Sequence, residues 1–164
     1  MNLIVAKDQN NGIGRNNGLL VSLKKDMQYF KEKTMGKVVV MGMNTYNSLP
    51  TKFRPLPNRL NIVISRNRGV DEDGVIVVKS VDELFKVLGE RHIDESDVFC
   101  IGGASIYKLL LPYCDRLYIT NIMKKFDDAD VFFPELNMIE WKLVSSTKAE
   151  ENGITFFFEV LAKK

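Results

Sequence analysis

The sequence has 164 residues, of which 45% are hydrophobic and 27% charged, with a formal net charge of +2. This length suits one domain with its own core over residues 1–164, and the balanced charge disfavours a nucleic-acid-binding domain, which usually carries a strong basic excess. The first residues lack a basic segment followed by a long apolar run, and no apolar run approaches the roughly 20 residues that span a bilayer, so we expect a cytoplasmic protein without membrane partners.

Short apolar runs rich in β-branched residues alternate with helical patterns along the chain. The runs expected to form strands are 3–6, 38–41, 60–64, 75–78, 98–101, 117–122, 142–145 and 155–161. The helical patterns cover 22–31 with Ser22 as N-cap, about 44–49, 80–89 with Ser80 as N-cap and Gly89 as the stop, and 104–111 ended by Pro112. Strands alternate with helices first and follow one another at the end. This order predicts an α/β fold: a mostly parallel central sheet of about eight strands with an antiparallel C-terminal edge, flanked by about four helices.

An acidic residue lies on the apolar side of the first predicted helix. At about 100° per residue, Met27 and Phe30 fall within roughly 40° of Leu23, and Asp26 lies about 60° to one side. Burying a carboxylate costs free energy and raises its pKa, so Asp26 is a candidate for proton chemistry or for binding a cationic or amidine-like group. The alternative is an acid that only interacts with the helix dipole, and the spacing leaves this open.

Three of the predicted strands end in residues that suit an anion. One strand runs into Gly42 and another into Gly102 and Gly103, and each is followed by a helix whose first N–H groups are accessible. A third strand ends in Ser65 and Arg66, a hydroxyl and a guanidinium suited to a phosphate monoester. Each glycine alone is also explained by a tight turn, and the chain contains neither GxGxxG nor a P-loop. Together the three junctions predict a ligand with several phosphates, such as a dinucleotide.

The two cysteines and the single histidine offer little material for metal or thiol chemistry. Cys100 lies in an apolar run and Cys114 beside a turn that begins with proline, so both are predicted to be buried apolar residues. Their spacing fits neither a metal motif nor a redox pair. His92 lies in a charged stretch and is expected on the surface. No metal site is therefore predicted, and a mechanism that depends on histidine is disfavoured.

The order and spacing of these segments resemble the dihydrofolate reductase family, from Leu3 to the C-terminus. The segments that carry the resemblance are 3–6 with 11–14 (first strand and flexible active-site loop), 22–31 (helix with the active-site acid), 40–50, 54–61, 101–107, 117–120 and 130–134. The resemblance implies reduction of 7,8-dihydrofolate to tetrahydrofolate, with hydride from NADPH passing to C6 of the pterin and a proton reaching N5. It also implies a role in one-carbon metabolism, a monomer, and binding of antifolate inhibitors.

The resemblance implies that Asp26, assisted by Thr120, pairs with a ring nitrogen and the amino group of the pterin, while the proton arrives through water. Arg59 would bind the glutamate α-carboxylate of the substrate through its guanidinium fork. The full substrate-binding set that it implies is Ile4, Val5, Asp26, Met27, Phe30, Leu49, Arg54, Leu56, Arg59, Ile101, Tyr107 and Thr120.

For the cofactor, the resemblance implies a cis peptide between Gly102 and Gly103 beside the nicotinamide. The residues on the nicotinamide side would be Ala6, Ile13, Gly14, Ile101, Gly102, Gly103 and Tyr107. The pyrophosphate would lie at Gly42, Met43, Asn44 and Thr45 and at the helix start formed by Ala104, Ser105 and Ile106. Ser65 and Arg66 would take the adenosine 2′-phosphate.

Two positions depart from the family pattern. The family usually has Pro-Trp where this chain has Leu20-Val21, and a basic residue where it has Met43, so the preference for NADPH depends more on Arg66. Two alternatives stay open. The riboflavin-pathway reductase of the same fold would keep the glycine pair but has no need of Asp26 and Arg59, and a non-catalytic folate- or nucleotide-binding module would tolerate Val21.

Overall fold

The computed structural model describes residues 1–67 and 73–164. The strands and α-helices are, in chain order, β1 (Asn2–Lys7), β2 (Gly12–Gly14), α1 (Lys24–Thr34), β3 (Val38–Gly42), α2 (Met43–Ser48), β4 (Leu60–Ile64), β5 (Val75–Val78), α3 (Val81–Glu90), β6 (Val98–Gly102), α4 (Ala104–Leu110), β7 (Arg116–Ile122), β8 (Val131–Phe132), β9 (Trp141–Glu151) and β10 (Ile154–Lys163). Short 3-10 turns cover Thr51–Phe53, Glu95–Asp97 and Leu111–Tyr113.

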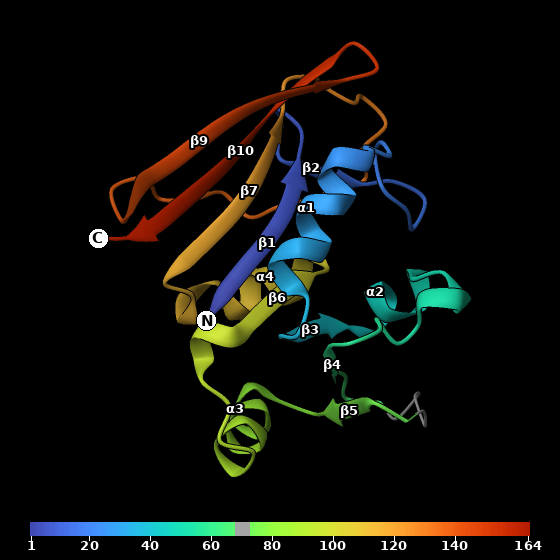
Figure 1. Cartoon of the computed structure of the whole chain (residues 1–164), viewed down its shortest axis with the longest axis vertical. Coiled ribbons are helices and arrows are strands. Elements are labelled where there is room, and N and C mark those ends of the chain that lie inside the picture. Colours follow the sequence, from blue (N-terminus) through green and yellow to red (C-terminus); the bar gives the residue numbers. More distant parts are fainter. Residues whose placement is uncertain (68–72) are drawn as a thin grey trace.

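Eight strands form one sheet in the order β5-β4-β3-β6-β1-β7-β10-β9 (Figure 1). The strands from β5 to β7 pair in parallel, whereas β10 is antiparallel to both β7 and β9. The predicted α/β fold with an antiparallel C-terminal edge is therefore confirmed. Since β9 reverses the direction of β10, it runs the same way as β7, and its last residue lies at the edge where β1, β3 and β6 also end. This edge carries the candidate site.

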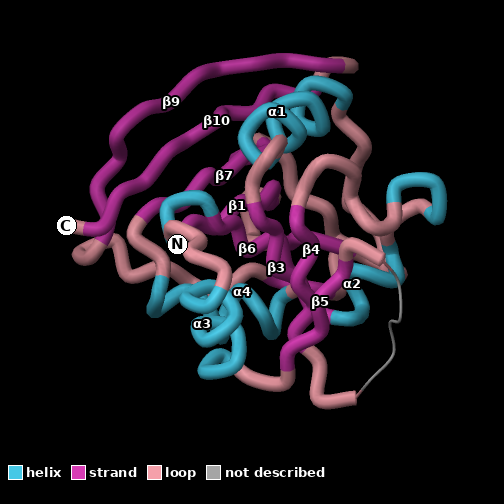
Figure 2. Tube along the Cα trace, turned by 60° about the horizontal axis from the view of Figure 1, so that its bottom comes forward, coloured by secondary structure: helices cyan, strands magenta, loops and turns pink. Residues whose placement is uncertain are grey.

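The central strands are apolar on both faces, as continuous hydrophobic runs predict. On β3, Val38 and Val40 belong to the buried cluster that includes residues of α3 and α4. Val39 and Met41, on the other face, belong to a cluster that includes Tyr46 of α2 and is contacted by Phe30 of α1. Figure 2 shows α1 on one side of the sheet and α3 and α4 on the other.

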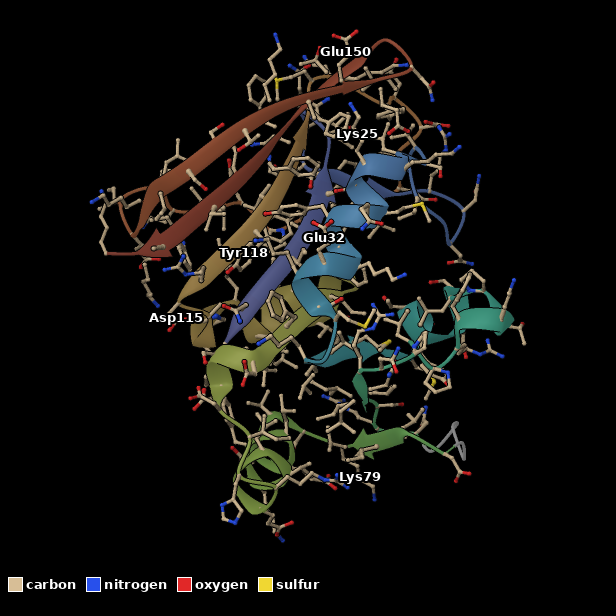
Figure 3. All side chains as sticks on the ribbon, in the orientation of Figure 1. Lys25, Glu32, Lys79, Asp115, Tyr118 and Glu150 are labelled. Carbon is tan, nitrogen blue, oxygen red and sulfur yellow. The ribbon has the colours of Figure 1, made fainter. Side chains whose placement is uncertain are left out.

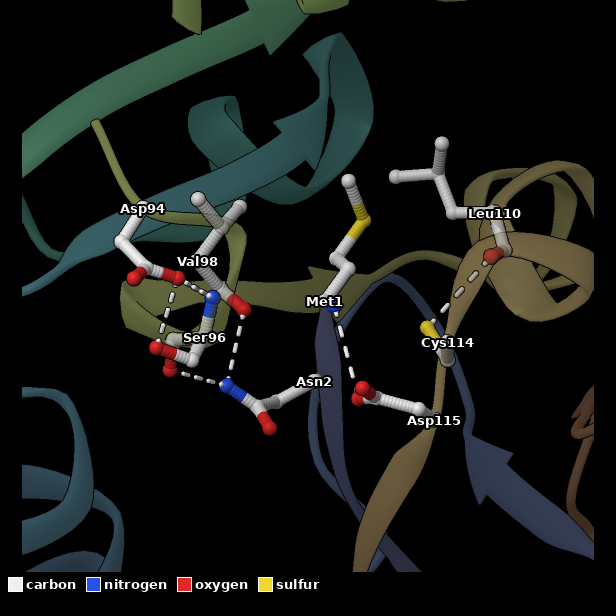
Figure 4. A network of polar contacts seen from close by, with 8 residues as sticks. All are labelled: Met1, Asn2, Asp94, Ser96, Val98, Leu110, Cys114 and Asp115. Carbon is white, nitrogen blue, oxygen red and sulfur yellow. Dashed lines mark hydrogen bonds and ion pairs between the residues drawn. The ribbon is translucent and has the colours of Figure 1, made fainter. Parts of the chain in front are cut away.

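At the opposite edge of the sheet, polar contacts fix the start of β1 (Figure 4). The side-chain amide of Asn2 donates to the carbonyls of Ser96 and Val98 over 2.8 and 3.2 Å. The amino group of Met1 lies 3.5 Å from a carboxylate oxygen of Asp115. The beginning of β1 is thus tied to the two segments that flank it in the sheet.

Several element boundaries differ from the sequence prediction. The predicted N-cap Ser22 is wrong, because α1 begins at Lys24 after an extended Leu23 whose side chain caps nothing. Ser80 caps α3 as predicted, by accepting from the N–H of Glu83. The predicted stop at Gly89 is wrong, because Gly89 lies inside that helix, where a Cβ would meet no atom within 4 Å. The exposed polar half of β9 was missed, as were β2 and β8, which are two or three residues long.

Three smaller expectations can also be compared with the structure. Cys100 and Cys114 are both buried and free, as predicted. His92 is exposed, as predicted, and adopts a positive φ of 56° just after α3. Among the described residues, no helix combines the length and the apolar character needed to cross a membrane.

Candidate active site

Asp26 in the first turn of α1 contacts Thr120 of the neighbouring strand β7. The Thr120 hydroxyl donates to Oδ1 of Asp26 over 2.6 Å, and Thr120 is only 2% exposed. Burial raises the pKa of the Asp26 carboxyl, the hydrogen bond from Thr120 opposes this rise, and the negative charge of Glu151 adds to it. The acid therefore holds its proton closer to neutral pH than an exposed aspartate does.

A small cleft opens beside this pair. It is lined by Ala6, Ile13, Leu19, Leu20, Val21, Leu23, Asp26, Met27 and Ile122. Met27 is 54% exposed although it lies on the apolar side of α1, because that part of the helix faces the cleft and not the core. Val21 lies at the wall of this cleft, where the family pattern has a tryptophan.

Four of the apolar residues predicted to bind substrate share one cluster, which does not include Ile4 or Met27. Phe30, Leu49, Leu56 and Ile101 pack with the buried group on the α1 side of the sheet. The structure does not bring the Val5 side chain into this group, because Val5 packs in the cluster that includes residues of α3 and α4. Successive side chains of a strand point to opposite faces of the sheet, so Val5 points away from the face that Ile4 and Ala6 share.

Arg59 is held at the far end of α1, the end away from Asp26. Its Nη1 donates to the Thr34 hydroxyl over 3.1 Å and its Nε to the carbonyl of Pro57 over 2.9 Å. Burial lowers the pKa of Arg59. These two bonds use two of the five N–H groups of a guanidinium, so the fork retains donors for a carboxylate.

A buried asparagine, which was missed in the sequence, orders the segment that carries Arg59. Asn61 is fully buried, accepts from the N–H of Leu56, and donates to the carbonyls of Leu56 and Arg59. The available signal was an amide inside the apolar run of β4. Arg54 lies nearby, with its guanidinium 5.6 Å from the centre of the Tyr46 ring.

The glycine pair at the end of β6 has the cis peptide that the family resemblance implied. Gly102 has a φ of +117°, and a Cβ there would lie 3.1 Å from the Tyr107 ring, so a side chain is excluded. The Tyr107 hydroxyl lies 2.8 Å from the carbonyl of Ile4 and 2.9 Å from that of Ile101. One hydroxyl proton therefore serves two carbonyls, one on β1 and one on β6.

This bridge marks the place where the sheet opens. Among the described residues, β1 and β6 pair at Asn2 with Phe99 and at Leu3 with Cys100, and the pairing ends there. Ile4 and Ile101 would be the next pair, and at that level the Tyr107 hydroxyl stands between their carbonyls. The two central strands thus separate toward their carboxyl ends, beside the cleft.

The starts of α2 and α4 lie next to each other at this edge. A Cβ on Gly42 would lie 2.9 Å from Cγ1 of Ile106, and a Cβ on Gly103 would lie 3.3 Å from the Thr45 hydroxyl. Bare backbone at both junctions therefore lets the starts of α2 and α4 pack closely, with Ile106 and Thr45 in the space that a Cβ would need. The other predicted cofactor residues of these helix starts, Met43, Asn44, Ala104 and Ser105, are half-buried or exposed at the same place.

Ser65 and Arg66 extend from the end of β4. The Ser65 hydroxyl donates to the Asn67 carbonyl over 2.6 Å and accepts from the Asn67 N–H. Arg66 is exposed. The sheet order places this hydroxyl and guanidinium beside the Gly42 junction, since β4 is the neighbour of β3.

The active-site loop is anchored by a buried acid, Asp8, that was missed in the sequence. Both oxygens of Asp8 accept backbone N–H groups: Oδ1 from Asn10 and Gly12, and Oδ2 from Phe126. A Cβ on Gly12 would lie within 3.0 Å of Asp8, so this turn excludes a side chain. Beyond it, the predicted cofactor residues Ile13 and Gly14 lie in β2.

The loop is also tied to the segment before β8. Asp130 accepts from the N–H of Asn16 over 3.0 Å and donates its own N–H to the Gly14 carbonyl. Arg15 pairs with both carboxylate oxygens of Asp128 at 2.7 and 2.8 Å. The loop that carries Ile13 and Val21 to the cleft therefore has a defined second support.

An α/β sheet with a half-buried carboxylate and bare glycine junctions at one edge defines an enzyme that binds small molecules at its strand ends. The chain belongs to the dihydrofolate reductase family, whose model matches residues 1–163. It is accordingly an oxidoreductase.

Known relatives agree with this assignment over their full length. A dihydrofolate reductase of Bacillus subtilis is 39% identical over 167 residues, which cover 100% of this chain and 95% of the relative. The enzyme of the same name from Sus scrofa is 39% identical over 182 residues, covering 99% and 97%. That of Haemophilus influenzae is 40% identical over 165 residues, covering 99% and 98%.

Proposed function

We propose that this chain reduces 7,8-dihydrofolate to 5,6,7,8-tetrahydrofolate with NADPH, consuming one proton and releasing NADP⁺. The observation that carries this proposal is the hydrogen bond between Thr120 and Asp26 at the wall of the cleft. A half-buried carboxylate held at one oxygen presents two acceptors to a flat, amidine-like N–H pair, which is the group that a pterin offers.

The substrate is proposed to lie along α1. Asp26 binds the ring nitrogen and amino group of the pterin, and Thr120 fixes the orientation of the carboxylate. The cluster of Phe30, Leu49, Leu56 and Ile101 supplies an apolar slot, which favours the rings and benzoyl group by roughly 25 cal/mol per Å² that leaves water. Arg59 then meets the glutamate carboxylate at the far end of the helix.

The proton is proposed to reach N5 of the pterin through water, with Asp26 as the nearby acid. The raised pKa of Asp26 lets the site hold a proton at a higher pH than an exposed aspartate would. Leu20 and Val21 cover this side of the cleft with apolar surface. Because valine is smaller than the tryptophan of the family pattern, we expect more water above the pterin in this chain.

The residues at the strand ends suit a nicotinamide dinucleotide, because the junctions at Gly42 and at Gly102 and Gly103 bring the first N–H groups of α2 and α4 together at one edge of the sheet. When bound, this cofactor supplies the hydride that passes to C6 of the pterin. Gly102 and Gly103 present bare backbone to the nicotinamide, and the Gly42 junction and the start of α4 face the pyrophosphate. Ser65 and Arg66 hold the 2′-phosphate, so NADPH is preferred to NADH.

The test is the loss of NADPH absorbance with dihydrofolate as substrate, with NADH run in parallel. Turnover that favours NADPH supports the proposal. Binding of both ligands without turnover would replace it with a non-catalytic binding module, and turnover of the pyrimidine substrate of the riboflavin pathway in place of dihydrofolate would favour that reductase. Size-exclusion chromatography tests the accompanying proposal of a monomeric domain over residues 1–164.

A further inference from the structure

The first turn of α1 is capped by a side chain from a distant strand. Oε2 of Glu151 accepts from the N–H of Lys24 over 2.8 Å, and Oε1 accepts from the N–H of Lys25 over 2.9 Å. A helix start leaves four N–H groups without a partner inside the helix, and a neighbouring side chain normally meets one of them. Here the N-cap residue Leu23 has no such group, so Glu151 takes that role for two N–H groups.

Sheet topology explains why Glu151 reaches this helix. It is the last residue of β9, which ends at the same edge as β7, and α1 begins at that edge. The turn to β10 is made by Asn152 and Gly153, both with positive φ. Lys25 makes a second link, because its Nζ donates to the Glu150 carbonyl over 2.9 Å. Figures 1 and 3 show the hairpin end of β9, with Glu150 labelled, beside the first turn of α1 with Lys25.

We propose that Glu151 is a positioning residue for Asp26, acting from the β9–β10 hairpin on the first turn of the helix that carries the acid. The proposal rests on the proposed function only in assigning Asp26 to the reaction. Asp26 directly follows Lys25, whose N–H is held by Glu151. Any shift of this turn moves the carboxylate relative to Thr120.

Both supports of the turn come from one part of the sheet. Thr120 on β7 is paired with Phe158 on β10, and Ile154 of β10 is paired with Glu151 on β9. The strand that orients the Asp26 carboxylate and the strand that caps its helix are therefore linked through β10. Stacking of Tyr29 on Phe158, with ring centres 4.3 Å apart, adds an apolar contact between the same helix and β10.

Glu151 also acts on Asp26 through its charge. The backbone hydrogen bonds from Lys25 and Lys24 lower the pKa of Glu151, so it is ionised at neutral pH. Its charge opposes ionisation of Asp26 and works in the same direction as burial. The other titratable groups around the acid are Lys24, Lys25 and Tyr29 on α1, Tyr107 on α4 and Tyr118 on β7. Burial raises the pKa of Tyr29 to about 12 and also raises the pKa of Tyr107, so both are neutral near pH 7, and Glu151 is the anion that acts on Asp26.

The experiment is an NMR titration of the Asp26 carboxyl carbon in the full chain without ligands. Four proteins are compared: wild type, Glu151→Gln, Glu151→Asp and Glu150→Gln. The Glu150 variant makes the same charge change one residue away and is the matched control, since Glu150 contacts α1 through its carbonyl. Glutamine keeps one acceptor for the helix but removes the charge.

We expect the pKa of Asp26 to fall in Glu151→Gln, to stay nearer the wild-type value in Glu151→Asp, and to move less in Glu150→Gln. Equal shifts in the two glutamine variants, or no shift in folded Glu151→Gln, would overturn the proposal. The titration needs no turnover, so its outcome is separate from that of the proposed function.

A kinetic measurement completes the test. In Glu151→Gln we expect kcat for dihydrofolate to fall by roughly 2- to 10-fold, the loss that follows from about 0.5–1.4 kcal/mol at 25 °C. NADPH affinity should change less than 2-fold, because the cofactor residues lie on other elements. A fall in NADPH affinity that matches the fall in kcat would mean general loosening of the fold and would also overturn the proposal.

Discussion

The hydroxyl of Thr120 and the carboxylate of Asp26 meet at 2.6 Å, although 94 residues separate them along the chain. Thr120 lies on β7 of the sheet, and Asp26 lies in the first turn of α1. The hydrogen bond holds one carboxylate oxygen and opposes the rise in pKa that burial causes.

Replacing Asp26 with asparagine removes the acid but keeps the shape and the acceptor for Thr120. We expect turnover of dihydrofolate at neutral pH to fall by roughly 100-fold or more, the usual contribution of a group in acid–base catalysis. NADPH affinity should stay within about 2-fold, because the residues proposed to hold the cofactor lie on other elements. Steady-state kinetics and a fluorescence titration measure the two quantities. Equal turnover numbers for the two proteins would defeat the role given to Asp26.

The same substitution should stabilise the fold at neutral pH. Because burial raises the pKa of Asp26 above 3.8, the native state holds this proton more tightly than the unfolded chain does. The stability due to the protonated acid is present below pH 3.8 and is lost as the pH rises through the folded pKa. Asparagine does not ionise, so the variant does not lose this stability as the pH rises. Each kcal/mol of unfolding free energy kept in this way raises Tm by about 2–4 °C in a chain of this size. Thermal unfolding of both proteins from pH 4 to 8 checks this, and a gap in Tm that does not widen with pH would contradict it.

Thr120→Val keeps the volume of the side chain but removes the donor to Asp26. The hydrogen bond lowers the pKa of the acid, so its loss should raise that pKa further. The pH at which the rate of hydride transfer begins to fall should therefore move upward, and KM for dihydrofolate should rise by about 10-fold because the carboxylate is no longer oriented. Thr147→Val, at an exposed position on β9, is the matched control. An unchanged pH profile in a folded Thr120→Val protein would argue against the contact.

Arg66→Ala tests cofactor preference. With Met43 where the family usually has a basic residue, Arg66 is the guanidinium proposed for the 2′-phosphate, and a hydrogen bond to a charged group contributes about 1.5–3 kcal/mol. We expect KM for NADPH to rise by roughly 10- to 100-fold while KM for NADH changes little. Arg91→Ala, at the exposed C-terminal end of α3, is the control. An equal rise for both cofactors would place Arg66 away from the phosphate.

Much of the fold could be predicted because local pattern and tertiary structure agree in it. The bounds of β4 and β5 were predicted to the residue, since continuous apolar runs in a parallel sheet end where burial ends. Ser80 was recognised as a cap because its acceptor is local in sequence. The start of α1 was misplaced for the opposite reason: its cap is Glu151, which lies 127 residues from Lys24.

Some residues of the candidate site could likewise be predicted from local sequence patterns, and others could not. Asp26 was found from helical spacing, and the glycine junctions from their position after apolar runs. Asp8 was missed because one of its partners, the N–H of Phe126, lies 118 residues away. Asn61 was missed although its partners Leu56 and Arg59 are close in sequence, because its position inside the apolar run 60–64 was interpreted only as part of a strand. Val5 was grouped with its neighbours on β1, although strand alternation sends its side chain to the other face.

The separation of β1 from β6 has a mechanical consequence. Beyond Leu3 and Cys100, β1 and β6 no longer pair with each other, and the Tyr107 hydroxyl links their carbonyls instead. The sheet is therefore divided between these two strands at its carboxyl edge. Each bridged carbonyl has a second lone pair, which a ligand can use. A ligand that donates hydrogen bonds to both carbonyls would link β1 and β6, and at concentrations above its Kd it would stabilise the folded sheet against separation of the two strands.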